Sequence, residues 1–168
     1  ICMFMVKAFQ LVQSPGPLFF RQERVGLAGK RFVIWKFRSM MHDETGTRDE
    51  AEQASSQDPR IFSLGRFMRR FSIDEIPQFL NVLKGEMNLI GPRPPVPSEV
   101  EKYKLRHYRR FSFKPGITGL WQVSGRNEIK NFEDWVKLDL EYIDNWSFKN
   151  DFIIVIKTFK TIFKGSGI

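Results

Sequence analysis

Two short runs rich in aromatic and apolar residues stand near the start of the chain. One spans residues 18–24 and the other residues 31–37, and residues 25–30 between them include two glycines. Extended, aromatic-rich segments separated by a short glycine-containing connection are typical of a β-hairpin. The pattern therefore predicts two antiparallel strands directly after the turn-forming sequence Ser-Pro-Gly-Pro of residues 14–17.

Apolar residues recur at three- and four-residue spacing over much of the remaining chain, which predicts helices. Helices are expected at residues 61–71, 74–83, 98–110 and 132–146. Residues 91–95, with the sequence Gly-Pro-Arg-Pro-Pro, cannot form regular structure because proline fixes φ and lacks a backbone N–H. The glycine-containing residues 114–126 are predicted to form an ordered loop. The expected fold class is therefore α+β, mostly helical, with a small β-hairpin.

The segment of residues 151–164 is two-sided. Lys157, Lys160 and Lys164 share one face of a predicted helix, and phenylalanine and aliphatic side chains form the opposite stripe. This division suits a helix that lies in a membrane interface. A core helix has the same periodicity, and periodicity alone favours it. Residues 1–12 are also mostly apolar but too short to span a bilayer, so they are the end of a membrane-embedded helix or a core helix.

Composition narrows the class of protein. The 168 residues carry 27 Lys and Arg against 19 Asp and Glu, a net charge of +8, and 42% of them are apolar. This apolar content excludes a disordered chain, and one cysteine with two histidines excludes a disulfide scaffold or a Cys/His zinc module. Residues 42–57 are acidic, lack apolar periodicity and are predicted to form a mobile surface loop. The basic remainder indicates an anionic partner: nucleic acid, a membrane surface or a phosphorylated substrate.

Asp74 and Glu75 are the most informative acidic residues. Ser72 followed three residues later by Glu75 fits a capping box, and Pro77 is tolerated only in a first helical turn. Both signals place the pair at a helix N-terminus, where acidic residues complement the helix dipole. The same place suits phosphate binding, with Arg69 close by and a divalent cation between the carboxylates and the phosphate. One carboxylate can then attack phosphorus while the other holds the metal.

Three further segments carry candidate phosphate or nucleotide contacts. Prolines on both sides present Arg93 with little conformational freedom, which suits phosphate recognition, although a rigid turn with an exposed arginine has the same pattern. Lys36 and Arg38 stand at the end of the predicted hairpin, where a solvated strand end is the alternative. Glycines in residues 114–127 would let the backbone approach a ligand. The possible base or sugar contacts in this segment are Trp121, Gln122, Arg126 and Asn127.

Taken together, these segments resemble the bacterial sugar transferase family, the monotopic phosphoglycosyl transferases that start glycan assembly on a polyprenol phosphate. The matching stretches are residues 14–40, 58–95 and 114–127, in the same order and spacing. The resemblance implies a membrane-associated enzyme at the bacterial inner membrane, with its catalytic domain on the cytoplasmic face. It also implies that residues 1–13 are the end of an N-terminal membrane-embedded helix and that residues 14–168 are the phosphoglycosyl transferase catalytic domain.

The resemblance implies a role for each candidate residue. Asp74 would attack the sugar-linked phosphate of a UDP-sugar and release UMP, and a polyprenol (undecaprenyl) phosphate would then take the phosphosugar from Asp74. Glu75, together with Asp74, would bind Mg²⁺. This transfer would be the first membrane step in assembling a polysaccharide or glycoprotein glycan. The residues implied to bind substrate are Arg69, Arg93, Arg126, Lys36 and Arg38.

Two other interpretations are open. A basic, phenylalanine-rich surface can stack on single-stranded nucleic acid, but Lys and Arg form no single continuous helix and no recognised nucleic-acid motif here. A membrane-bound scaffold that kept the fold and lost activity is the second, against which Asp74, Glu75 and Arg93 argue. The resemblance leaves the sugar and the oligomeric state undetermined.

Overall fold

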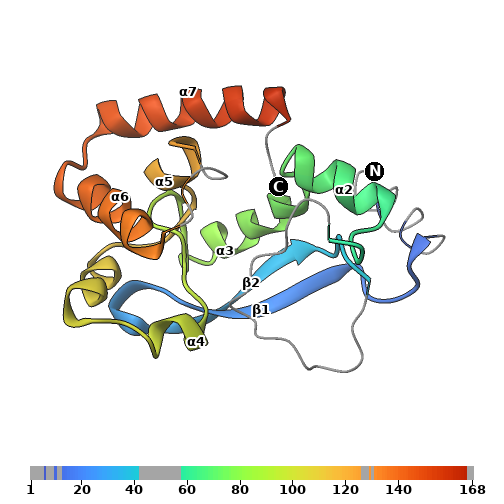
Figure 1. The fold of residues 1–168 in the computed structure, drawn as a ribbon, viewed down its shortest axis with the longest axis horizontal. Coiled ribbons are helices and arrows are strands. Elements are labelled where there is room, and N and C mark those ends of the chain that lie inside the picture. Colours follow the sequence, from blue (N-terminus) through green and yellow to red (C-terminus); the bar gives the residue numbers. More distant parts are fainter. Residues whose placement is uncertain are drawn as a thin grey trace.

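The computed structural model describes residues 6, 10, 13–41, 58–125, 129 and 131–165. With η denoting a 3₁₀ helix, its elements in chain order are β1 (Phe19–Val25), η1 (Leu27–Gly29), β2 (Arg31–Phe37), α2 (Ser63–Arg70), η2 (Ile73–Gln78), α3 (Phe79–Leu83), β3 (Asn88–Ile90), α4 (Pro97–Val100), η3 (Leu105–Ser112), β4 (Gly116–Thr118), α5 (Leu120–Val123), α6 (Phe132–Asp144) and α7 (Phe148–Lys164). Figure 1 shows helices packed around the β1–β2 hairpin, and a second two-stranded sheet pairs β3 with β4; helices are the main regular structure, and this confirms the predicted α+β class.

Strands β1 and β2 form the predicted hairpin. They pair antiparallel over their whole lengths, with Phe19 opposite Phe37. The connection turns the chain through Ala28 and Gly29, both at positive φ (53° and 75°). Residues with positive φ give the connection a twist that matches the twist of the two strands. Glycine is favoured in such connections because it adopts positive φ without steric cost. The hairpin prediction is confirmed.

The second sheet was not predicted. β3 pairs parallel with β4, so Asn88 lies opposite Gly116 and Ile90 opposite Thr118. The prediction of a loop over residues 114–126 is therefore wrong, because this stretch contains β4 and α5. A parallel pair joins residues far apart in the chain, and a local pattern carries no signal for it.

Glycines explain the close approach of these two strands. A Cβ at Gly116 would lie 2.1 Å from the backbone nitrogen of Gly91, and one at Gly119 would lie 2.2 Å from the carbonyl oxygen of Gly91. At these two positions the missing side chain allows close contact with the backbone of Gly91. The sequence had predicted that these glycines would allow close contact with a ligand instead. They hold residues 91–95 against β4 and the start of α5.

The helix predictions are confirmed in part. Helices α2, α6 and α7 form where the spacing of apolar residues predicts them. The basic helix predicted over residues 98–110 is instead two short helices, α4 and η3, because Lys104 is extended (φ −81°, ψ 160°). Its backbone N–H donates to Nδ1 of His107 (3.1 Å), which starts η3 afresh. The segment predicted as a helix over residues 74–83 is the 3₁₀ helix η2 followed by α3.

A hydrophobic core lies where the hairpin meets α2. Val6, Phe37, Phe62 and Met68 form its buried centre. Gln10 is completely buried beside it, and its Nε2 donates to the carbonyl oxygen of Arg38 (2.7 Å). Val6 and Gln10 of the segment 1–13 therefore pack on the rest of the protein, and Oε1 of Gln13 accepts a hydrogen bond from the backbone N–H of Leu64 (3.0 Å). Residues 1–5, 7–9, 11 and 12, and the acidic residues 42–57 predicted to form a loop, lie outside the described residues.

Helix α7 buries a face that the sequence did not single out. Figure 1 shows α7 across the top of the molecule, on the far side from the hairpin. It packs on the domain through Ile154, and Oγ1 of Thr158 lies 2.9 Å from Oγ1 of Thr118 in β4. The aromatic stripe points away from the domain, with Phe163 82% exposed. Among the described residues, no helix is long and apolar enough to cross a membrane.

Candidate active site

The hairpin positions η2 and α3. Asn81 of α3 is completely buried, and its Nδ2 donates to the carbonyl oxygen of Val33 and to Oε2 of Glu86 (2.7 Å each). Its Oδ1 accepts from the backbone N–H of Trp35 (3.3 Å). A buried amide with these partners is costly to move, because its groups would lose their hydrogen bonds away from water. Asn81 therefore fixes η2 and α3 against β2.

The far end of the hairpin holds the proline-rich segment. Nη1 of Arg24 donates to the carbonyl oxygen of Pro94, and the backbone N–H of Val25 donates to that of Pro95 (3.0 Å each). Arg24 is buried, so this contact is shielded from water. The hairpin thus brings η2 and residues 91–95 to the same place, although they are well separated in the chain.

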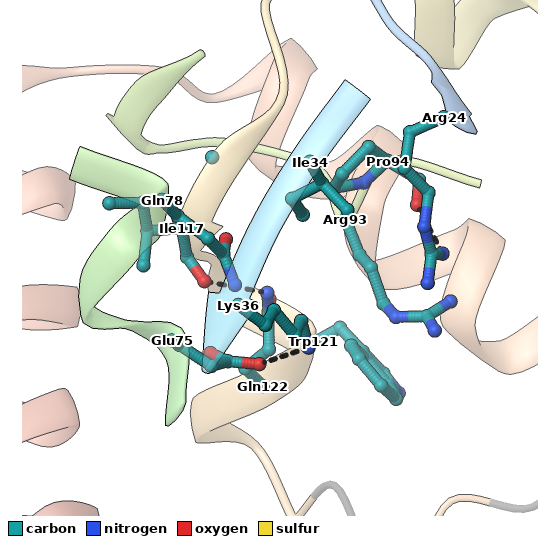
Figure 2. A pocket seen from close by; sticks show the side chains of 11 residues that line it. Arg24, Ile34, Lys36, Glu75, Gln78, Arg93, Pro94, Ile117, Trp121 and Gln122 are labelled. Atoms are coloured by element: carbon teal, nitrogen blue, oxygen red, sulfur yellow. Dashed lines mark hydrogen bonds and ion pairs between the residues drawn. The ribbon is translucent and has the colours of Figure 1, made fainter. Parts of the chain in front are cut away.

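A pocket lies between these elements. Figure 2 shows its side chains, which come from both strands of the hairpin, η2, the proline-rich segment, β4 and α5. Three of them are basic and one is acidic, so the pocket suits an anion. The lining residues are Arg24, Ile34, Lys36, Glu75, Gln78, Arg93, Pro94, Gly116, Ile117, Trp121 and Gln122.

Glu75 faces the hairpin. Its Oε1 accepts a hydrogen bond from Nζ of Lys36 (2.8 Å), an ion pair with both side chains largely shielded from water. The predicted capping box is wrong: Ser72 takes the left-handed conformation (φ 54°), and its side chain makes no capping hydrogen bond. The positive φ directs the chain so that the carboxylate of Glu75 meets a cation on another element.

Asp74 lies beside the pocket and is only 7% exposed. It does not line the pocket, whereas its neighbour Glu75 does. Two adjacent carboxylates supply the hard oxygen ligands that Mg²⁺ prefers, and Mg²⁺ commonly takes one or two protein carboxylates with phosphate oxygens and waters. The described residues contain no group of three or more His, Cys, Asp or Glu side chains that could hold a metal by themselves. Magnesium binding by Asp74 and Glu75 therefore stays a prediction, in which a phosphate and waters would supply the remaining ligands.

Two other predicted substrate contacts, Arg38 and Arg69, do not line the pocket. Arg38 is buried, and its Nε and Nη1 donate to the carbonyl oxygen of Pro17 (2.7 Å) and to Oγ of Ser14 (2.6 Å). These bonds anchor the turn before the hairpin. Arg69 is half-buried in the last turn of α2. Arg126 lies outside the described residues, so its role stays a prediction.

Sequence reasoning missed several residues of the site. Arg24, Gln78 and Asn81 are buried polar side chains at the hairpin or in η2 and α3. None follows a periodic pattern, and a buried polar residue looks like a surface residue in sequence. The one available signal for Gln78 was its place next to Pro77, directly after the acidic pair.

Comparison with known protein sequences shows which family this chain resembles. A family model described as "Bacterial sugar transferase" matches residues 1–165. The galactosyl transferase CpsE of Streptococcus agalactiae is 47% identical over 94% of this chain and 37% of that protein. The UDP-glucose:undecaprenyl-phosphate glucose-1-phosphate transferase of Escherichia coli is 45% identical over 92% of this chain and 34% of that protein.

A shorter relative resembles this chain over most of its length. The uncharacterized sugar transferase EpsL of Bacillus subtilis is 43% identical over 90% of this chain and 73% of that protein. This chain therefore spans about a third of the length of the first two relatives and about three quarters of the third.

Proposed function

Since this chain belongs to the bacterial sugar transferase family, we propose that it transfers a sugar 1-phosphate from a UDP-sugar to a polyprenol phosphate and releases UMP. The observation that carries the proposal is the acidic pair of η2 beside a pocket lined by Arg24, Lys36 and Arg93. A sugar nucleotide brings a diphosphate, and three basic side chains around one pocket complement that charge.

In the first step, a carboxylate oxygen of Asp74 attacks the sugar-linked phosphorus. A bond forms between Asp74 and this phosphorus, the bond from phosphorus to the bridging oxygen breaks, and UMP leaves with that oxygen and its electron pair. In the second step, an oxygen of the polyprenol phosphate attacks the same phosphorus and releases the Asp74 carboxylate. The product is a polyprenyl diphospho-sugar, and atoms and charge balance over the two steps.

Each charged residue of the pocket has a separate task. Arg93 and Arg24 bind phosphate oxygens and keep the diphosphate in place. Lys36 holds Glu75 at 2.8 Å and adds positive charge next to the reacting phosphorus. Magnesium, held by Glu75 and Asp74, would neutralise part of the charge of the diphosphate.

The direct test is Asp74→Asn in the full-length protein with Mg²⁺ and a panel of UDP-sugars. UMP release should fall to background, because the amide is not a nucleophile toward phosphorus. Asp144→Asn is the matched control: this acid forms an exposed ion pair with Arg109 away from the pocket, and its amide variant should keep wild-type turnover. Wild-type turnover in Asp74→Asn would show that the nucleophile is another group.

We further propose that α7 lies at the surface of the bacterial inner membrane, on the cytoplasmic face, close to the lipid acceptor. Four phenylalanines share its outward face, with Lys157, Lys160 and Lys164 exposed next to them. An outward aromatic stripe flanked by lysines suits an interface of apolar chains and anionic headgroups. The four phenylalanines are Phe148, Phe152, Phe159 and Phe163.

Spin labels at single cysteines test this placement in a Cys2→Ser background. A label at position 163 in anionic lipid nanodiscs should be relaxed by oxygen dissolved in lipid more than by a water-soluble nickel complex. Leu105 of η3 is 90% exposed and supplies the control position, where the opposite preference is expected. Equal preferences at the two positions would contradict the proposal.

The nucleic-acid-binding alternative is not favoured. The matching family is one of sugar transferases, and the relatives from Streptococcus agalactiae and Escherichia coli are named as a galactosyl transferase and a glucose-1-phosphate transferase.

A further inference from the structure

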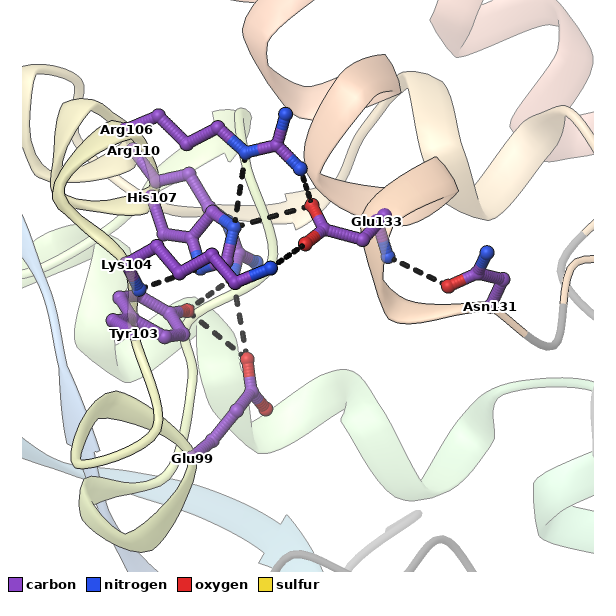
Figure 3. A network of polar contacts seen from close by, with 8 residues as sticks. All are labelled: Glu99, Tyr103, Lys104, Arg106, His107, Arg110, Asn131 and Glu133. Atoms are coloured by element: carbon purple, nitrogen blue, oxygen red, sulfur yellow. Dashed lines mark hydrogen bonds and ion pairs between the residues drawn. The ribbon is translucent and has the colours of Figure 1, made fainter.

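Arg110 of η3 is the centre of a buried ion cluster. Its side chain is 3% exposed, and that of its partner Asp139 in α6 is 2% exposed. Nε and Nη2 of Arg110 lie 3.0 Å and 2.8 Å from Oδ2 of Asp139, and Nη1 lies 3.2 Å from Oε1 of Glu99. Nη1 also donates to the hydroxyl of Tyr103. We call Glu99, Tyr103, Arg110 and Asp139 the Arg110 cluster; Figure 3 shows three of its members.

The Arg110 cluster holds both ends of Arg93. Nη2 of Arg110 donates to the backbone carbonyl oxygen of Arg93 (3.0 Å). Oε2 of Glu99 lies 3.7 Å from Nη1 of Arg93, which makes an ion pair with the guanidinium. The two oxygens of Glu99 therefore divide their work, one toward Arg110 and the other toward Arg93.

Trp121 bounds the other side of the Arg93 side chain. Cζ of Arg93 lies 5.9 Å from the centre of the Trp121 ring, within the range of a cation–π contact. Both residues line the pocket, whereas Glu99 and Arg110 do not. The carboxylate that aims Arg93 therefore stands outside the pocket, where it leaves the substrate-facing side of the guanidinium to the ligand.

Burial gives this arrangement its rigidity. Asp139 is surrounded by protein, and burial raises its pKa to about 6 although Arg110 opposes the shift. The hydroxyl of Tyr103 is similarly desolvated, and its pKa is raised. Groups that have lost their water depend on one another for hydrogen bonds, so displacement of one disturbs all of them.

We propose that Glu99 and Arg110 are positioning residues of the transfer, which hold Arg93 in place before the donor diphosphate binds. This inference rests on the proposed function, because it takes a phosphate of the donor as the partner of Arg93. A guanidinium already held in place loses little freedom on binding. Neither Glu99 nor Arg110 touches the substrate.

A double-mutant cycle on the affinity for UDP tests the inference in the full-length protein. Glu99→Gln preserves the shape of the side chain and removes the charge that aims Arg93; it should weaken UDP binding about tenfold. Arg93→Ala should weaken it at least as much. The double variant should bind UDP no more weakly than Arg93→Ala alone, because Glu99 acts only through Arg93.

Arg110→Lys is the second variant, since it keeps the positive charge and loses the planar fork that reaches both Glu99 and the Arg93 carbonyl. It should weaken UDP binding by about the same factor as Glu99→Gln. The control is Glu133→Gln, an acid-to-amide change in an ion cluster on the other side of η3 that does not touch Arg93. Its UDP affinity should equal that of the wild type.

A purely structural role gives different results. Independent, multiplicative effects of Glu99→Gln and Arg93→Ala overturn the inference. So does tighter UDP binding in Glu99→Gln, since Glu99 would then compete with phosphate for Arg93. The steady-state constants add a second readout, in which Glu99→Gln should raise KM for the UDP-sugar more than it lowers kcat.

The failure of each proposal is recognisable. If the wild type binds UDP and releases no UMP, while Glu99→Gln and Arg93→Ala show the expected non-additive effects on UDP affinity, the proposed reaction is contradicted and the positioning role is supported. If the wild type releases UMP but the two substitutions act independently on UDP affinity, only the positioning role is contradicted. A wild type that does not bind UDP contradicts both.

Discussion

Two ion clusters on η3 connect it to α6, and they differ in burial. The Arg110 cluster is enclosed by protein, with its two central side chains 3% and 2% exposed. The second cluster joins Lys104, Arg106 and His107 to Glu133, and we call it the Glu133 cluster. Lys104 and Arg106 are 72% and 62% exposed at their side chains. Figure 3 shows the two clusters next to each other.

The comparison teaches that burial decides what an ion pair does. Exposed pairs are screened by water and salt and stabilise a protein by about 0–1 kcal/mol. A buried pair has given up its hydration, so removal of one partner costs about 3–5 kcal/mol. Of the two clusters, only the Arg110 cluster contacts a residue that lines the pocket, because it bonds the backbone of Arg93 and pairs with its guanidinium. The Glu133 cluster joins two helices through exposed Lys104 and Arg106 and through the buried His107, whose side chain is 2% exposed.

The largest expected effect comes from Arg110→Met. At pH 8 this change leaves Asp139 buried without its cation, and the free energy of unfolding should fall by about 3–5 kcal/mol. Urea denaturation followed by tryptophan fluorescence measures it. A loss below about 1 kcal/mol would place the buried cluster in the same class as the exposed one.

A double variant separates the lost ion pair from the lost volume. Arg110→Met with Asp139→Leu removes both central charges, so no unpaired carboxylate remains at position 139. The double variant should be more stable than Arg110→Met alone, since apolar replacement of a buried pair is commonly neutral or stabilising. Lower stability in the double variant would indicate that packing, and not charge, sets the effect.

A smaller effect is expected from Glu133→Gln. At pH 7 the loss in unfolding free energy should be much smaller than that of Arg110→Met, because water and salt screen the cluster. Raising the ionic strength should reduce even this difference. A loss as large as that of Arg110→Met would contradict the link between burial and energetic weight.

The pH dependence of the two variants sharpens the comparison. Desolvation raises the pKa of Glu133, but hydrogen bonds from Lys104, His107 and Arg106 outweigh it and hold that pKa below the ordinary 4.5. A carboxyl group whose pKa is lower in the folded protein than in the unfolded chain stabilises the fold at every pH above its unfolded pKa. This stabilisation is lost as the pH falls through its folded pKa. The difference between wild type and Glu133→Gln should therefore persist down to about pH 4.5 and vanish at lower pH.

Arg110→Met should respond at higher pH. The pKa of Asp139 is about 6 with Arg110 present, and it rises further when the cation is removed. Protonation then relieves the unpaired buried charge, so the loss in stability should already shrink as the pH falls below about 7. The same pH window for both variants would contradict the assigned burial of Asp139.

Local pattern was sufficient for several parts of the fold. The hairpin, α2, α6 and α7 follow from the spacing of apolar residues and from glycine and proline positions. The same reasoning placed Lys36, Glu75 and Arg93 among the candidate residues, and all three line the pocket. It was wrong about the capping box at Ser72 and the loop over residues 114–126, where the deciding partner lies elsewhere in the chain.

By itself, the sequence determined the α+β class, the family and the charged residues from which the site is built. The tertiary structure decided which charges meet: Glu75 pairs with Lys36 of the hairpin, 39 residues away. It also decided that Arg110 is buried while Arg106, on the same helix, remains in water. The physical reason is that the hydration and the ion pairing of a charged side chain depend on the residues that other elements place around it. The sequence of one segment does not contain that information.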